Sequence, residues 1–251
     1  MHPILFHLFG YPISTFGIML AIAFLTGTWL TARRLAEIGI DPEAATTMLI
    51  YAMIGGIGGS KLYFALDVSM REGIPFAQLL FAREGITFYG GLIGAVALVI
   101  VGTKIHRIPT GPFFNAVCLA GAIGQALGRI GCFLVGDDYG RPTDGPFGIA
   151  FPEGAPPTLD RVHPTQLYES AWLFAVTAFL WVRRDKSPRL WAEYLVLAGI
   201  GRFAVEFLRV NPRVWLGLSE AQLIALGLVT IGVASWLHAR REPTAAAVRA
   251  V

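Results

Sequence analysis

The sequence predicts an all-α integral membrane protein with seven transmembrane helices, and its composition and its apolar runs support this prediction. Hydrophobic residues make up 55% of the 251 residues and charged residues only 15%, and the mean hydropathy is +0.59. Soluble domains carry about 25% charged residues, so this composition excludes both a water-soluble globule and a disordered chain. Apolar runs that are long enough to cross about 30 Å of hydrocarbon recur along the chain.

We expect seven of these runs to be spans within one domain, residues 1–242. Their approximate ranges are 13–31, 47–66, 86–102, 113–127, 168–182, 190–208 and 221–237. The one long connection, 128–167, is rich in Gly, Pro and Asp, and we expect it to be an ordered periplasmic loop. Residues 243–251 are expected to form a flexible cytoplasmic tail.

The distribution of Lys and Arg predicts the orientation, because these residues are enriched in cytoplasmic loops. The connections at 32–46, 103–112, 183–189 and 238–251 hold eleven of them in short stretches. The alternate connections hold seven over many more residues. The N-terminus and the long loop are therefore expected to face the periplasm, and the C-terminus the cytoplasm.

Polar residues inside spans are costly, by about 2.5–3.5 kcal/mol for a charge at mid-span, and they usually have a function. With the predicted orientation, six of them fall near the periplasmic leaflet: Lys61, Tyr89, Arg129, Glu169, Arg202 and Glu206. Arg202 and Glu206 are four residues apart and share one helix face. These groups predict a functional pocket, and the alternative is a set of structural ion pairs between helices.

Three glycine pairs have the spacing of close helix contacts. They are Gly55 with Gly59, Gly90 with Gly94, and Gly124 with Gly128. We interpret them as packing faces.

Four stretches are unusual for membrane helices: 88–95 (FYGGLIGA), 128–141 (GRIGCFLVGDDYGR), 163–169 (HPTQLYE) and 201–209 (GRFAVEFLR). In this order, and with seven spans, they resemble the bacterial prolipoprotein diacylglyceryl transferases. The second stretch is similar to the signature block of that family. The resemblance extends from about residue 13 to residue 209.

This resemblance implies a reaction and its partners. The enzymes transfer the diacylglyceryl group of phosphatidylglycerol to the lipobox cysteine thiol of a prolipoprotein, and they release glycerol 1-phosphate. The implied partners are phosphatidylglycerol, the prolipoprotein signal peptide and membrane lipid. The implied location is the bacterial inner membrane, with the active site toward the periplasmic leaflet. No cofactor is implied, and the net charge of +3 gives no indication of nucleic-acid binding.

The resemblance also implies residue roles. Arg129 matches the essential arginine of the signature block and is assigned to the lipid phosphate, because a guanidinium binds phosphate oxygens bidentately. Arg202 matches the arginine of the sixth-span motif and is assigned to leaving-group stabilisation. Gly90, Gly91 and Gly140 are assigned to lipid binding.

The base that removes the thiol proton has two candidates. A free thiol has a pKa of about 8.5 and is mostly protonated at neutral pH. Well-studied members have a histidine where this chain has Tyr89, and a phenol is a poor base unless cations assist it. His163 is the other candidate, and its alternative role is to order the loop before Pro164.

Supporting roles are expected for Asp137, Gln166, Glu169, Glu206 and Lys61. Asp137 or its neighbour Asp138 is expected to pair with Arg129 or Arg141, and the alternative is that both aspartates are solvated turn residues. The chain departs from common family residues at four positions, which are Phe16, Cys132, Val135 and Ala198. The five histidines lack metal-ligand spacing, and no metal is expected.

Two other functions remain open from the sequence. A paralogue with the same fold and altered pocket residues could lipidate another acceptor. A small transporter would also carry ionisable residues in its helices, but it predicts polar groups through the whole depth and an inverted repeat, and the sequence has neither.

Overall fold

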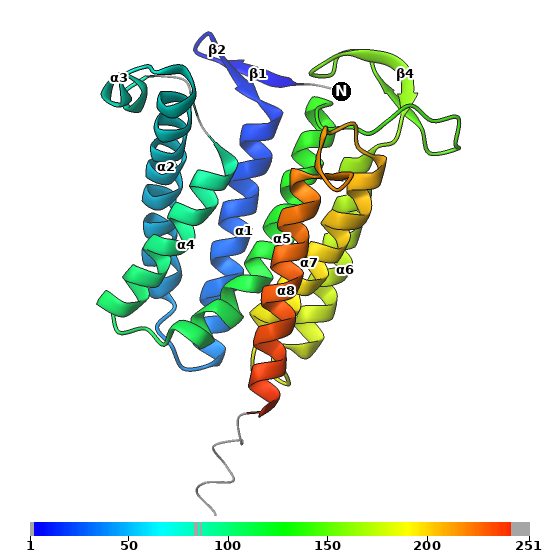
Figure 1. Ribbon diagram of the computed structural model, residues 1–251. Helices are drawn as coiled ribbons and strands as arrows, with labels where there is room; N and C mark the ends of the chain where they lie inside the picture. Colours follow the sequence, from blue (N-terminus) through cyan, green and yellow to red (C-terminus); the bar gives the residue numbers. More distant parts are fainter. Residues whose placement is uncertain (1–2, 83–84, 86, 242–251) are drawn as a thin grey trace, which may run out of the picture. The chain divides into compact units, whose positions relative to one another are not determined.

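The computed structural model describes residues 3–82, 85 and 87–241, and most of these residues are helical (Figure 1). The helices are α1 (Thr15–Glu37), α2 (Glu43–Glu72), α3 (Phe76–Leu80), α4 (Phe88–Ile105), α5 (Thr110–Val135), α6 (Thr165–Arg183), α7 (Leu190–Val205), the 3₁₀ turn η1 (Glu206–Leu208) and α8 (Glu220–Arg241). The tail expected at 243–251 and the start of the span expected at residue 86 lie outside the described residues.

Three short hairpins accompany the helices, so the all-α prediction was incomplete. Each is a two-stranded antiparallel sheet. The strands are β1 (Ile4–Leu8) with β2 (Tyr11–Ser14), β3 (Ile149–Phe151) with β4 (Thr158–Val162), and β5 (Arg213–Trp215) with β6 (Leu218–Ser219). Strands of two to five residues are too short to stand out in a search for membrane-length apolar runs.

The helices have the length and hydropathy of a membrane protein. Four of them, α1, α2, α5 and α8, are long and apolar enough to cross a bilayer, and α4 is a shorter apolar helix. The chain is therefore an integral membrane protein. The remaining two predicted spans coincide with helices α6 and α7, and the count of seven spans stays a prediction.

The long connection is shorter than expected. Helix α5 continues to Val135 and α6 begins at Thr165, so the loop expected at 128–167 occupies 136–164. The loop was expected to begin at residue 128 because the stretch is rich in Gly, Pro and Asp, but glycine is frequent inside transmembrane helices. The helix ends at Gly136, which adopts the left-handed conformation (φ 77°) and donates its N–H to the Cys132 carbonyl over 2.9 Å.

The helices belong to two compact units, Met1–Leu30 with Phe114–Val251 and Thr31–Phe113. In the second unit, α2 and α4 pack through glycines. Gly55 lies against the backbone of Gly94, and Gly59 lies against the carbonyl oxygen of Gly90. A Cβ at any of these four positions would collide with the facing backbone. The packing interpretation is confirmed for these two pairs.

The third glycine pair behaves differently. Within their own unit, no described atom lies within 4 Å of a Cβ built on Gly124 or Gly128. The predicted packing contact there is therefore not found inside that unit. Spacing alone does not tell which face of α5 another helix covers.

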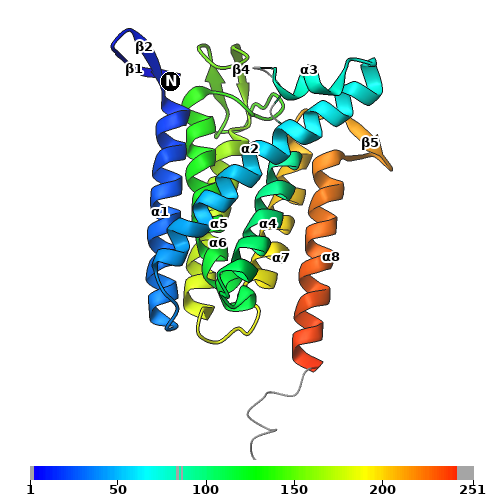
Figure 2. The same cartoon turned by 90° about the vertical axis from the view of Figure 1, so that its left-hand side faces the viewer.

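The first unit has its own core between helices. Leu30 of α1, Leu119 of α5 and Leu180 of α6 belong to one buried cluster. Helix α7 packs on α8 through Gly199 and Gly232, where a Cβ would meet atoms of the opposite helix at 2.7–2.9 Å. Within this unit the three hairpins lie at one end of the helices (Figures 1 and 2). The same end holds the start of α6 and the end of α7, and the candidate site is located there.

The glycine contact between α2 and α4 predicts a specific loss of stability. Gly59→Ala should lower the free energy of unfolding by about 1–3 kcal/mol, because the added methyl group has no room beside the Gly90 carbonyl. The measurement is unfolding of the detergent-solubilised protein followed by circular dichroism.

Gly58→Ala is the matched control, since no described atom lies within 4 Å of a Cβ at Gly58. This variant should be neutral or slightly stabilised, because alanine is favoured over glycine inside a helix. Equal stability of the two variants would contradict the close contact.

Candidate functional site

Arginines and carboxylates from separate segments meet at the hairpin end of the first unit. They are Arg129 of α5, Asp138 of the following loop, Glu169 of α6, Arg202 of α7, Glu206 of η1 and Arg209. We name these six residues the arginine–carboxylate cluster. Glu169 lies near the N-terminus of its helix and Arg202 in the last turn of its helix. The helix dipole favours the position of Arg202.

Glu169 connects two arginines of this cluster. Its Oε2 lies 2.5 Å from Nε of Arg129, and its Oε1 accepts a hydrogen bond from NH1 of Arg202 over 2.6 Å. The Glu169 side chain is only 6% exposed. One buried carboxylate therefore holds guanidinium groups from two different helices, with one oxygen for each.

Glu206 is the second buried carboxylate and is completely inaccessible. Its Oε2 lies 3.0 Å from NH2 of Arg202, as their spacing of four residues predicts. Its Oε1 accepts hydrogen bonds from Asn211 Nδ2 over 2.6 Å and from Ser219 Oγ over 2.8 Å. The sequence interpretation did not include Asn211, which precedes the β5–β6 hairpin, or Ser219, which ends it.

Asp138 is the third carboxylate and bridges two more arginines. Its Oδ2 accepts a hydrogen bond from NH1 of Arg129 over 2.9 Å, and its Oδ1 accepts one from NH2 of Arg209 over 2.6 Å. Arg209 is buried and also donates NH1 to the Asp138 carbonyl over 2.8 Å. Of the pairings expected for Asp137 or Asp138, the structure thus has Asp138 with Arg129.

The loop that carries Asp138 is attached to the ends of α6 and α7. Thr165 Oγ1 donates to the Asp138 carbonyl over 2.9 Å, and Gln166 donates its side-chain amide to the Asp137 carbonyl. Gly140 donates its N–H to the His163 carbonyl over 2.9 Å. These bonds fix the position of the loop backbone beside the cluster.

Gly140 is needed for the close approach of this loop to the end of α7. A Cβ at this position would lie 2.5 Å from the Leu208 carbonyl oxygen and 2.8 Å from Thr165 Cγ2. Gly140 was assigned to lipid binding, and that role stays a prediction. The lack of space for a side chain explains a glycine at this position independently of lipid binding.

The cluster is balanced in charge, with three arginines and three carboxylates. Burial disfavours the charged form of Asp138, but Arg209 and Arg129 outweigh this effect and hold the pKa of Asp138 below its usual value. Burial raises the pKa of the neighbouring Asp137. The two neighbouring aspartates thus differ, because Asp138 and not Asp137 has a pKa below its usual value.

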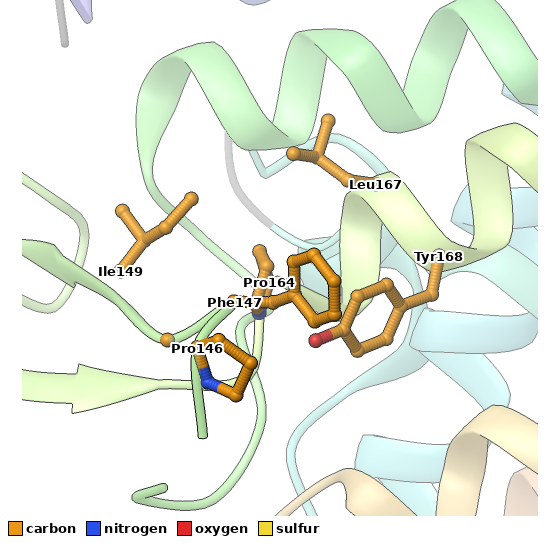
Figure 3. A pocket seen from close by; sticks show the side chains of 7 residues that line it. Pro146, Phe147, Ile149, Pro164, Leu167 and Tyr168 are labelled. Carbon is orange, nitrogen blue, oxygen red and sulfur yellow. The ribbon is translucent and has the colours of Figure 1, made fainter. Parts of the chain in front are cut away.

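His163 and an apolar hollow lie beside the first turn of α6. Nδ1 of His163 is 3.4 Å from the Tyr168 hydroxyl, and the two rings meet edge to face. Tyr168 also lines a hollow of about 420 Å³ (Figure 3). The other lining residues are Pro146, Phe147, Gly148, Ile149, Pro164 and Leu167. The first turn of α6 thus contacts the charged loop through Thr165 and Gln166 and the hollow through Leu167 and Tyr168.

The remaining predicted site residues lie in the second unit. Lys61 donates its ammonium group to the Ala82 carbonyl. Tyr89 is half-buried in the first turn of α4. Gly90 and Gly91 face α2, where a Cβ would collide with the Gly59 carbonyl oxygen and with Ser60 Oγ, respectively. Their roles toward a lipid stay predictions.

Three possible metal ligands also gather at this end of the first unit. The ligand atoms of Cys132, Asp137 and Asp138 lie within 4.8 Å of one another. The sequence interpretation considered histidine spacing and did not consider this group. Both carboxylate oxygens of Asp138 are bonded to guanidinium groups, which compete with a cation for them.

Three of the four departures from common family residues, Phe16, Cys132 and Val135, also lie in this part of the first unit. Gly131 packs against α1, since a Cβ at this position would lie 3.1 Å from Met19 Cβ and 3.2 Å from Phe16 Cδ2. Cys132 is a half-buried free thiol. Val135 ends α5 and Ala198 lies within α7, and nothing in the structure explains these two residues.

The fold and the site define a class of protein. It is a helical membrane protein in which buried arginines and carboxylates form a balanced network at one end of a unit. The family model described as prolipoprotein diacylglyceryl transferase matches residues 3–238. The chain belongs to this family.

Similar proteins carry the same family name. The phosphatidylglycerol–prolipoprotein diacylglyceryl transferase of Clostridium tetani is 36% identical, with 93% of this chain and 96% of the relative covered. The transferase of the same name from Trichormus variabilis is 30% identical, with coverages of 96% and 91%. That from Clostridioides difficile is also 30% identical, with coverages of 96% and 97%.

The bridging position of Glu169 predicts a large effect on stability. Glu169→Gln should lower the free energy of unfolding by about 1–3 kcal/mol, because it removes the charge that Arg129 and Arg202 share and leaves each of them with a single carboxylate partner. Glu153→Gln is the matched control, since Glu153 is exposed in the same region of the chain. Thermal unfolding in detergent measures both, and equal melting temperatures would contradict the bridging role.

Proposed function

We propose that this protein is a phosphatidylglycerol–prolipoprotein diacylglyceryl transferase. Its substrates are then phosphatidylglycerol and a prolipoprotein whose lipobox cysteine accepts the diacylglyceryl group. The names of the relatives and the nearly complete coverage of both chains support this proposal. The observation that carries it is the pair of arginines, Arg129 and Arg202, held on opposite oxygens of Glu169.

The proposed reaction needs positive charge at the phosphate. The cysteine sulfur attacks the phosphate-bearing carbon of the diacylated glycerol, and the bond from this carbon to the phosphate oxygen breaks. A thioether forms, and glycerol 1-phosphate leaves with one more negative charge than the diester had. Arg129 binds the phosphate and Arg202 stabilises the departing charge, because guanidinium groups stay protonated and bind phosphate oxygens in pairs. Asp137, Gln166, Glu169 and Glu206 support the two arginines, and a supporting role is also proposed for Lys61.

The membrane arrangement is part of the proposal. Seven spans put the N-terminus and the loop 136–164 on the periplasmic side of the bacterial inner membrane and the C-terminus in the cytoplasm. The density of Lys and Arg in the opposite connections supports this orientation. The arginine–carboxylate cluster then lies toward the periplasmic leaflet, where lipid enters from the side and the prolipoprotein from outside.

Replacement of the two arginines tests the phosphate role. Arg129→Lys and Arg202→Lys should each lower kcat/KM about a hundredfold or more, since lysine keeps the charge but loses the planar fork. The assay is transfer from phosphatidylglycerol in mixed micelles to a synthetic lipobox peptide, with the thioether product detected by mass spectrometry.

Arg71→Lys is the control for this test, because Arg71 is 75% exposed and pairs with Asp67 at the surface. Its activity should equal that of the unaltered protein. Near-normal turnover by both site variants would refute the phosphate role. Absence of product from the folded, unaltered protein would refute the proposed reaction.

The proton of the acceptor thiol goes to His163 in this proposal, with Tyr89 as the alternative base. Imidazole accepts protons readily near neutral pH, whereas a phenol does so poorly. The contact with Tyr168 orients the ring, and the His163 carbonyl binds Gly140 of the loop that carries Asp138, a partner of Arg129. These observations support His163 over Tyr89.

His163→Asn should lower kcat about 10²- to 10⁴-fold, as expected for the loss of a general base. Tyr89→Phe should retain kcat within about threefold. The measurement is kcat over pH 5–9 for both variants, and the loss should diminish at alkaline pH, where the thiol ionises by itself. The reverse pattern would assign the proton transfer to Tyr89.

A further inference from the structure

Asp138 forms an ion pair with Arg129, the residue that the proposed function assigns to binding of the lipid phosphate. We propose that Asp138 is an exchangeable counter-ion of Arg129, which the phosphate of the lipid displaces while Asp138 remains paired with Arg209. This inference rests on the proposed function, because it concerns how the same site receives its anionic substrate. The exposure of the carboxylates, the donors of Arg129 and the anchoring of the loop support it.

The two carboxylates on Arg129 differ in how firmly they are held. The Glu169 side chain is 6% exposed and also binds Arg202, whereas the Asp138 side chain is 44% exposed. Exchange of a buried ion-pair partner is costly, and exchange of an exposed one costs about 1 kcal/mol or less. An incoming anion therefore displaces Asp138 and leaves Glu169 in place.

The donors of Arg129 favour such a displacement, because Asp138 competes with the phosphate for NH1. A bidentate grip on phosphate uses two adjacent guanidinium nitrogens, either Nε with NH2 or NH1 with NH2. Nε lies against Glu169 and NH1 donates to Asp138. Each pair of adjacent nitrogens thus includes one atom that a carboxylate already engages. The pair that contains NH1 becomes available when Asp138 moves away.

The Asp138 side chain can move away from Arg129 while the backbone of the loop keeps its position. Its carbonyl oxygen accepts hydrogen bonds from Thr165 Oγ1 and Arg209 NH1, so the backbone stays in place when the side chain moves. Its Oδ1 keeps the bond to Arg209 NH2 as an alternative partner. The departing carboxylate therefore remains compensated.

A counter-ion at this position has a physical benefit and a physical cost. Without substrate, the three arginines and three carboxylates of the cluster balance, and Arg129 does not stand as an isolated charge in partly buried surroundings. With substrate, the carboxylate competes with the phosphate for the same nitrogen. Removal of the carboxylate should therefore tighten lipid binding.

The test uses Asp138→Asn and Asp138→Gly. Residue 138 has a φ of 61°, which asparagine and glycine tolerate well, so neither replacement strains the backbone. Both variants should lower KM for phosphatidylglycerol about three- to fivefold, the scale of one exposed ion pair. Their kcat should change by less than about twofold. The assay is the transfer reaction in mixed micelles with a varied mole fraction of phosphatidylglycerol.

Asp144→Asn is the matched control, because it also removes one negative charge from an exposed residue of the same loop. Its KM should equal that of the unaltered protein. An unchanged or higher KM in both Asp138 variants would overturn the proposal. A fall in kcat without a fall in KM would overturn it as well, since it would make Asp138 a positioning residue for the chemical step.

A second measurement does not depend on turnover. Phosphatidylglycerol micelles should protect the Asp138 variants against thermal unfolding at a lower mole fraction than the unaltered protein, because ligand binding raises the melting temperature. Phosphatidylcholine micelles serve as the zwitterionic reference and should show no such difference. The difference should vanish in the Arg129→Lys background, where no bidentate grip exists.

The two measurements separate the two proposals. If the unaltered protein transfers no diacylglyceryl group but the variants bind phosphatidylglycerol more tightly, the proposed reaction fails and the counter-ion exchange stands. If transfer occurs and neither KM nor thermal protection responds to loss of the carboxylate, the exchange fails and the reaction stands.

Discussion

The site depends on one buried carboxylate between two guanidinium groups. Arg129 and Arg202 come from different helices and carry like charges, so they would repel each other in a partly buried environment. Glu169 offers one oxygen to each and thereby ties the ends of α5, α6 and α7 together. Two other contacts of the cluster extend this arrangement. Glu206 pairs with a second nitrogen of Arg202, and Asp138 pairs with a second nitrogen of Arg129.

The same arrangement explains how a balanced network can serve anion chemistry. Buried ion pairs contribute little net stability, because desolvation offsets their attraction. Their value here is positional: the guanidinium groups are oriented before the substrate arrives, so little reorganisation is needed when charge develops. The exposure of the carboxylates increases from Glu206 to Glu169 to Asp138. Glu206 and Glu169 are thus the fixed partners of the arginines, and Asp138 is the partner proposed to exchange with the substrate.

Backbone contacts decide where the exchangeable part lies. Gly136 ends α5 in the left-handed conformation, and the chain then passes so close to the end of α7 that residue 140 has no room for a side chain. Bonds from Thr165 and Gln166 to the carbonyl groups of Asp138 and Asp137 complete the attachment. A close backbone contact, a hydroxyl group and a side-chain amide therefore hold this part of the loop beside the cluster, and Phe151 of the same loop packs against Phe133 of α5.

The sequence alone determined that the chain is a helical membrane protein, because apolar runs of membrane length are local properties. It also indicated the Arg202–Glu206 pair, since residues four apart share a helix face, and the family, since the motifs are contiguous. It placed the end of α5 too early, because glycine marks helix ends in water but is common inside membrane helices. The pairing of Arg209 with Asp138 joins residues 71 positions apart, and that of Arg202 with Glu169 joins residues 33 positions apart. Only the tertiary structure decided these pairings, because many carboxylates and arginines were available and nothing local specifies which ones the fold brings within bonding distance.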